Sequence, residues 1–246
     1  MRPHGRHAAG ASHLSASRAR AFALCLLLPL AVGATAAQAA QPAPAAPAAQ
    51  SSVATTRVYL LRGVLNIFSL GLDTIGARLE AQGIPVTVTN FMHWSGLADD
   101  AIAAYKAGRL KTIILVGHSS GATALPDMIA KLNHLGVPVK LAIGLDSVFK
   151  TKLSTGAERY INIYIGDGPG EPVRAADGLR GKLDNVDVRG HGVGHISIDK
   201  NETIQRRVIA EIDAVVMRAR APAAPAEPGA PKPVARSAAA TAPARN

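Results

Sequence analysis

The sequence is poor in cysteine and in aromatic residues. Of its 246 residues one is a cysteine, Cys25, and Phe, Trp and Tyr together make up 4%. A single cysteine excludes an internal disulfide. Because Cys25 lies in an apolar N-terminal run, we expect processing to remove it. A thiol nucleophile and a thiolate metal site are then excluded as well.

The central part of the chain also has little excess of positive charge, although the formal net charge of the whole sequence is +10. Between Arg57 and Arg218 there are 19 basic and 16 acidic residues, and the remaining excess lies near the two ends. Aromatic residues do not alternate with Lys or Arg. A nucleic-acid partner is therefore not expected.

The N-terminal segment lacks acidic residues and a membrane-spanning apolar run. Four arginines precede an apolar stretch over residues 21–34, and Ala37-Gln38-Ala39 follows it. The stretch is shorter than the roughly 20 residues that span a bilayer. Residues 1–39 are therefore predicted to be a cleaved signal peptide. We expect export to a bacterial periplasm or exterior and no stable membrane span in the mature protein.

Two Ala/Pro-rich stretches have no apolar period that could build a core, and they flank the central region. Such composition is typical of semi-extended, disordered arms. The predicted organisation is a linker over residues 40–56, one domain over 57–218 and a disordered tail over 219–246.

Within the domain, short apolar runs alternate with helical patterns. Strands are expected over residues 58–61, 86–89, 112–116, 141–145, 160–165 and 186–188. Helices are expected over residues 71–82, 98–107, 122–135 and 203–218. Strands that are apolar on both faces and separated by helices indicate a mostly parallel sheet covered on both sides, which is a three-layer α/β sandwich. Reactive groups in such sheets gather at the C-terminal ends of the strands.

The strand over residues 112–116 runs directly into Gly117-His118-Ser119-Ser120-Gly121, and a helical pattern follows at once. This is the G-x-S-x-G motif in its strand–turn–helix context. The turn must be tight, so the residues two before and two after the serine must be small. Ser119 is therefore the predicted nucleophile, and the side chain of His118 is expected to face away from the reaction.

Residues 57–218 resemble a compact α/β-hydrolase of the lipase, esterase and thioesterase kind. The resemblance is carried by Leu60-Leu61-Arg62-Gly63, by the pentapeptide around Ser119 and by His195 late in the chain. It implies a serine hydrolase with the chain order serine, acid, histidine, and with no cofactor. The chain has no evident insertion for a lid, which favours an open site and short or soluble esters.

A serine hydroxyl needs a base, and two histidines remain as candidates after the others are assigned to the signal peptide, the turn or the surface. His195 follows a glycine-rich loop and precedes the closing helix, which is where the resemblance places the base. His191 lies in the same loop and is the weaker candidate. The glycines between the two exclude a helical face, and no carboxylate is placed to complete a metal site with them.

Two aspartates end strands and could orient the histidine. Asp146 follows residues 141–145 directly and is preferred, while Asp167, after residues 160–165, is the alternative acid. The oxyanion hole needs two backbone N–H groups. One belongs to Ser120, and by resemblance the other belongs to Val64 or Leu65. Arg62 stands where many members of the family have histidine.

The predicted function is hydrolysis of a small-molecule ester or thioester by an exported enzyme through an acyl-enzyme. Two other classes stay open. One is an exported binding module that keeps the fold without catalysis, and the other is a cell-envelope interaction protein that works through its Ala/Pro arms. The sequence predicts no oligomeric state.

Overall fold

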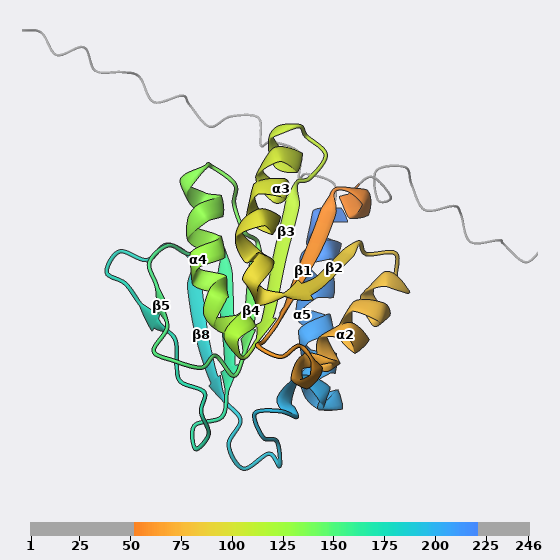
Figure 1. The fold of residues 1–246 in the computed structure, drawn as a ribbon. Coiled ribbons are helices and arrows are strands. Elements are labelled where there is room, and N and C mark those ends of the chain that lie inside the picture. Colours follow the sequence, from red (N-terminus) through yellow and green to blue (C-terminus); the bar gives the residue numbers. More distant parts are fainter. Residues whose placement is uncertain (1–51, 221–246) are drawn as a thin grey trace, which may run out of the picture. The chain divides into compact units, whose positions relative to one another are not determined.

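A computed structural model describes residues 52–220, which form a six-stranded sheet between two layers of helices (Figure 1). The predicted three-layer α/β sandwich is confirmed, and every pair of neighbours in the large sheet is parallel. The sheet order is β2-β1-β3-β4-β6-β8. Its strands are β1 (Thr56–Arg62), β2 (Val86–Asn90), β3 (Thr112–His118), β4 (Leu141–Leu145), β6 (Arg159–Tyr164) and β8 (Lys182–Asp187). The predicted signal peptide, most of the linker and nearly all of the tail lie outside the described residues.

Each face of the sheet is covered by two helices. The helices are α2 (Gly71–Glu80), α3 (Trp94–Lys106), α4 (Ser120–His134) and α5 (Glu202–Arg220). In β1, Val58 and Leu60 belong to the core under α2 and α5, whereas Tyr59 and Leu61 belong to the core under α3 and α4. Successive side chains of a strand point to opposite faces. A strand buried on both faces must therefore be apolar throughout, and that is the pattern its sequence shows.

The order of the strands reverses between β1 and β3. The chain passes from β1 to β2 on one side and then returns to β3 on the other side of β1. Leu61 of β1 pairs with Gly117 of β3, so the two strands end side by side. Crevices at such a switch point, beyond the carboxyl ends of the strands, are the usual ligand sites of open α/β sheets. The residues that follow β1 and β3 are Gly63 and Ser119.

Several elements differ from the sequence-based expectation. The last strand covers residues 182–187 rather than 186–188, because it is a half-exposed edge strand whose polar residues hide its period. The helix α3 begins at Trp94 rather than at 98, after a short 3-10 helix, η2 (Phe91–His93), that the Asn90 side chain caps by accepting from the Met92 N–H.

Four further short elements were not predicted. They are a two-stranded parallel sheet of β5 (Lys152–Leu153) and β7 (Arg174–Ala175), and the 3-10 helices η1 (Ile67–Ser69) and η3 (Ile198–Lys200). Among the helices of residues 52–220, none is both long and apolar enough to cross a bilayer.

Candidate active site

Ser119 occupies a strained turn between β3 and α4. Its backbone angles are φ 57° and ψ −124°, a combination that L-residues rarely adopt and that costs on the order of 1–3 kcal/mol. The turn leaves the residue with 8% of its surface exposed, and the N-terminus of α4 begins at the next residue. The unpaired N–H groups of that helix end favour negative charge beside the serine.

The glycines that flank Ser119 are required by close backbone contacts. A Cβ atom on Gly117 would lie 2.4 Å from the carbonyl carbon of Gly121, and a Cβ atom on Gly121 would lie 2.0 Å from the carbonyl oxygen of Leu61. Both distances are far below van der Waals contact. The structure thus confirms that the positions two before and two after the serine must be small.

The structure brings Ser119, His195 and Asp146 into one hydrogen-bonded chain. The Nε2 atom of His195 lies 2.9 Å from the Ser119 hydroxyl oxygen, and its Nδ1 atom lies 2.6 Å from Oδ2 of Asp146. Ser119 and Asp146 directly follow β3 and β4, and His195 lies in the loop after β8, so all three lie at the C-terminal end of the sheet. A carboxylate oxygen accepts hydrogen bonds, so Nδ1 donates to Oδ2 and the lone pair of Nε2 is directed at the Ser119 hydroxyl.

Asp146 is held in place by its surroundings as well as by His195. It is fully buried, and its Oδ1 atom accepts a hydrogen bond of 2.9 Å from the backbone N–H of Ile165. The residue has φ 50°, so the chain turns sharply after β4. A Cβ atom on Gly170 would lie 1.8 Å from Oδ1, which shows how tightly the neighbouring loop covers the carboxylate.

The weaker candidates lie elsewhere. Asp167 is exposed in the turn after β6, and within the described residues no hydrogen bond connects it to His195. His191 is exposed in the loop after β8, four residues before His195. The structure therefore places His195 rather than His191 next to Ser119, and Asp146 rather than Asp167 next to His195.

The predicted oxyanion donors are the N–H groups of Ser120 and Val64. Gly63 is close to the serine, since a Cβ atom built on it would lie 3.3 Å from the Ser119 hydroxyl oxygen. The carbonyl of Gly63 accepts from Nδ2 of Asn90 at 3.1 Å, and in a trans peptide the N–H of Val64 points the opposite way. Leu65, the alternative donor, has φ 64° and lies one residue further from the serine.

Arg62, at the place where the family often has histidine, is turned toward α2. Its guanidinium forms an ion pair with Asp73, with Nε 2.9 Å from Oδ2. This contact anchors the end of β1 directly before Gly63.

His118 lies behind His195 and was not recognised from the sequence as part of the site. Its ring centroid is 5.1 Å from that of His195, and its Nε2 atom lies 2.8 Å from the His195 carbonyl oxygen. Burial lowers the pKa of His118, although the nearby carboxylate of Asp199 acts in the opposite direction. Burial also raises the pKa of Asp199, whose Oδ2 atom accepts from the Gly71 N–H at 2.8 Å.

Exposed apolar side chains surround the site. Eight of the ten large hydrophobic residues that are most exposed among residues 52–220 follow the C-terminal ends of strands. They are Val64, Leu65, Ile67, Phe68, Leu70, Met92, Phe149 and Ile196. We call this set the apolar rim.

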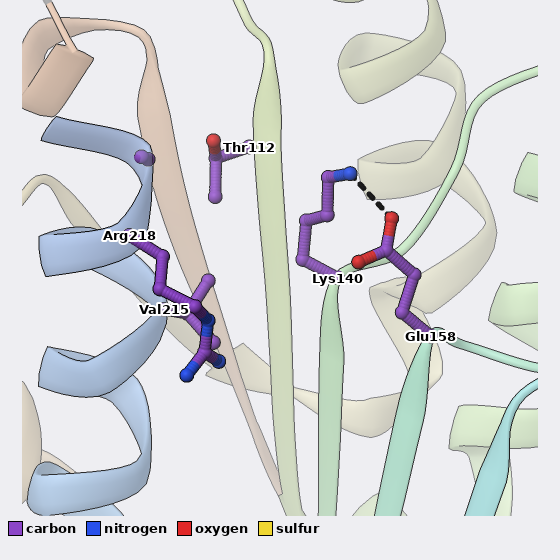
Figure 2. A pocket seen from close by; sticks show the side chains of 6 residues that line it. Thr112, Lys140, Glu158, Val215 and Arg218 are labelled. Atoms are coloured by element: carbon purple, nitrogen blue, oxygen red, sulfur yellow. Dashed lines mark hydrogen bonds and ion pairs between the residues drawn. The ribbon is translucent and has the colours of Figure 1, made fainter. Parts of the chain in front are cut away.

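A pocket of about 250 Å³ lies at the other edge of the sheet (Figure 2). Thr112 starts β3, Lys140 and Glu158 precede β4 and β6, and Arg218 comes from the end of α5. The Lys140 and Glu158 side chains form an ion pair there. Because these are the N-terminal ends of the strands, the pocket is remote from Ser119. Within residues 52–220 no three or more His, Cys, Asp or Glu side chains are grouped to hold a metal ion.

Comparison with known proteins gave matches among solved structures only. No family model and no curated protein matched the chain. Human thioesterase 2 is 9% identical with a TM-score of 0.45, and the match covers 68% of this chain and 98% of that one. The type II thioesterase BorB from the borrelidin biosynthetic cluster is 12% identical, with a TM-score of 0.46 over 67% and 92% of the two chains. The surfactin thioesterase domain SrfTE is 14% identical, with a TM-score of 0.42 over 65% and 90%.

Proposed function

We propose that this protein is a serine hydrolase that cleaves a carboxylic ester or thioester through an acyl-enzyme. The observation that carries the proposal is the continuous chain from Asp146 through His195 to Ser119, with atom separations of 2.6 and 2.9 Å. The 2.9 Å separation of the Ser119 hydroxyl and Nε2 of His195 lies within the range in which a proton can pass from nucleophile to base.

In the first half of the reaction the substrate is attacked. Nε2 of His195 accepts the hydroxyl proton of Ser119 while the serine oxygen bonds to the substrate carbonyl carbon. The N–H groups of Ser120 and Val64 donate to the oxyanion, and Asp146 stabilises the imidazolium that forms. The imidazolium then protonates the leaving alcohol or thiol as its bond to carbon breaks.

In the second half a water molecule replaces the leaving group. His195 takes a proton from that water, the resulting hydroxide attacks the acyl carbon, and the proton returns to Ser119 as the acid is released. The scheme uses only side chains and backbone groups of this chain, so it requires no cofactor. Oxyanion donors of this kind contribute on the order of 10²–10³ in turnover.

The test is labelling with a fluorophosphonate probe, which forms a stable phosphonyl bond only with an activated serine. Wild type should be labelled on Ser119, and the variants S119A and H195A should not be labelled. The exposed His191, changed to alanine, is the matched control and should leave labelling intact. A wild-type protein that takes up no probe and hydrolyses no ester would refute the proposal and would favour a binding module.

We also propose that the protein is exported, as the composition of residues 1–39 predicts. The test is fractionation of cells that carry the gene, with the N-terminus of the extracted protein determined by mass spectrometry. A protein that begins near residue 40 in the periplasm or medium supports export. A protein that retains residue 1 in the cytoplasm contradicts it.

A further inference from the structure

Two buried side chains that the proposed reaction does not use connect the loops of the site. His118 ends β3, Ser69 ends η1, and each is 1% exposed. The Ser69 hydroxyl oxygen lies 2.8 Å from Nδ1 of His118 and 3.0 Å from the backbone nitrogen of Gly63. On its other side His118 contacts the carbonyl of His195. A continuous chain of hydrogen bonds thus runs from Gly63, the residue before Val64, to His195, the proposed base.

The partners fix the direction of every hydrogen bond in this chain. A carbonyl oxygen can only accept, so Nε2 of His118 carries a proton and donates it to His195. Burial lowers the pKa of His118 and so favours the neutral imidazole, in which Nδ1 has a lone pair and accepts from the Ser69 hydroxyl. The Ser69 oxygen in turn accepts from the N–H of Gly63. Hydrogen bonds that all run in one direction polarise and strengthen one another.

This chain of hydrogen bonds joins two parts of the site, the loop that carries His195 and the peptide after Gly63, whose positions relative to Ser119 must both be kept. The loop before His195 contains Gly190, Gly192 and Gly194. The N–H groups of Ser197 and Ile198 donate to the Gly194 carbonyl and close a local turn, but these bonds lie within the loop and do not join it to β3. The ring of His195 must nevertheless stay within hydrogen-bond distance of two partners at once. The donor on His118 holds the main chain of His195, while Ser69 holds Gly63 on the oxyanion side.

We propose that His118 and Ser69 are positioning residues, which hold the backbone of His195 and the Gly63–Val64 peptide at the distances that Ser119 requires. This inference rests on the proposed function. It assigns to His118 one specific task, the donation of the Nε2 proton to a single carbonyl oxygen. A substitution that keeps that donor should preserve turnover, and one that removes it should not.

Substitution of His118 by glutamine or by asparagine distinguishes a variant that keeps the donor from one that removes it. A glutamine amide reaches about as far as Nε2 of histidine and can donate to the His195 carbonyl, whereas an asparagine amide reaches only about as far as Nδ1. We expect H118Q to keep kcat for a p-nitrophenyl ester within about threefold of wild type. H118N should lower kcat roughly 10- to 100-fold with little change in KM, because a misplaced base affects the transition state more than binding.

The matched control is H134N, which changes an exposed histidine of α4 in the same way and should leave kcat unchanged. Equal kcat in H118N and wild type would overturn the inference. Equal losses in H118N and H118Q would also overturn it, because the Nε2 donor would then not be what matters.

A second variant covers the case in which H118N does not fold. S69A removes the hydroxyl that connects Gly63 to His118, and it should lower kcat about tenfold at unchanged KM. An unchanged kcat in folded S69A would contradict the inference. A wild-type protein without ester turnover and without probe labelling would refute the proposed function itself, and the positioning role with it.

Discussion

The carboxylate of Asp146 is fully buried, and its Oδ2 atom lies 2.6 Å from Nδ1 of His195. Asn at this position keeps the size of the side chain but removes its charge and can favour the wrong tautomer of the histidine. We predict that D146N lowers kcat/KM by about 10³–10⁴. D167N, in the exposed turn after β6, is the control and should stay close to wild type. Ester hydrolysis by both purified variants decides between the two acids.

A methyl group at Gly121 is predicted to destabilise the fold. Its Cβ atom would lie 2.0 Å from the Leu61 carbonyl oxygen, so α4 or β1 must move. We expect G121A to lower the free energy of unfolding by about 3 kcal/mol or more and to reduce activity as well. G96A is the matched control, because Gly96 lies in α3 with open space around it, and it should stabilise the protein by about 0.5–1 kcal/mol. Urea unfolding of both variants measures the difference.

The turn that carries Ser119 could be predicted from the sequence, because the residues that require it are adjacent in the chain. The pentapeptide from Gly117 to Gly121 follows a strand that is apolar on both faces, so a tight turn and a small residue on either side of Ser119 are required together. Asp146 and Asp167 both follow apolar strands, so the sequence offered two acids, and it is the fold that places Asp146 against His195. By contrast, the contact of His118 with the His195 carbonyl joins residues 77 positions apart and depends on how the last loop folds back.

The stability of the protein is predicted to fall in mild acid because of His118. Burial lowers the pKa of this group in the folded state, so the unfolded chain takes up the proton first as the pH falls below about 6.5. The contribution of neutral His118 is thus complete above that pH and is lost as the pH falls toward the folded-state pKa. Asp199, His195 and Asp146 face the ring, and the raised pKa of Asp199 works in the opposite direction.

The comparison of wild type with H118Q isolates the effect of His118, because both proteins keep the three neighbouring groups. Between about pH 7.5 and pH 5.5, wild type should lose more unfolding free energy than H118Q, with a difference in slope of at most about 1.4 kcal/mol per pH unit. Chemical denaturation at the two pH values measures it. Parallel pH profiles would show that His118 does not titrate differently in the two states.

The apolar rim predicts a preference for esters with longer acyl chains, whereas the absence of a lid insertion in the sequence favoured short ones. An acyl group attached to Ser119 begins near Gly63 and His195, and the next residues along the chain, Val64 and Ile196, are exposed members of the apolar rim. Each buried CH₂ contributes about 0.8 kcal/mol, so kcat/KM should rise roughly fourfold per added CH₂ until the rim is covered.

The test is a series of monomeric p-nitrophenyl esters from acetate to octanoate, kept below the concentration at which they aggregate. F149S should flatten the dependence on chain length while acetate hydrolysis stays near the wild-type rate. L135S changes an exposed leucine at the opposite end of α4 and should leave the dependence unchanged. A flat series for wild type would show that the rim does not bind the acyl chain.

Rapid quenching followed by mass spectrometry shows whether Ser119 becomes acylated when His195 removes its proton. Within one turnover of p-nitrophenyl butyrate, the peptide that contains Ser119 should gain the mass of one butyryl group while nitrophenol is released in a stoichiometric burst. H195A should show neither the adduct nor the burst. Ester turnover with the acyl group on another residue, or with a wild-type rate in S119A, would refute the role of Ser119 as the nucleophile.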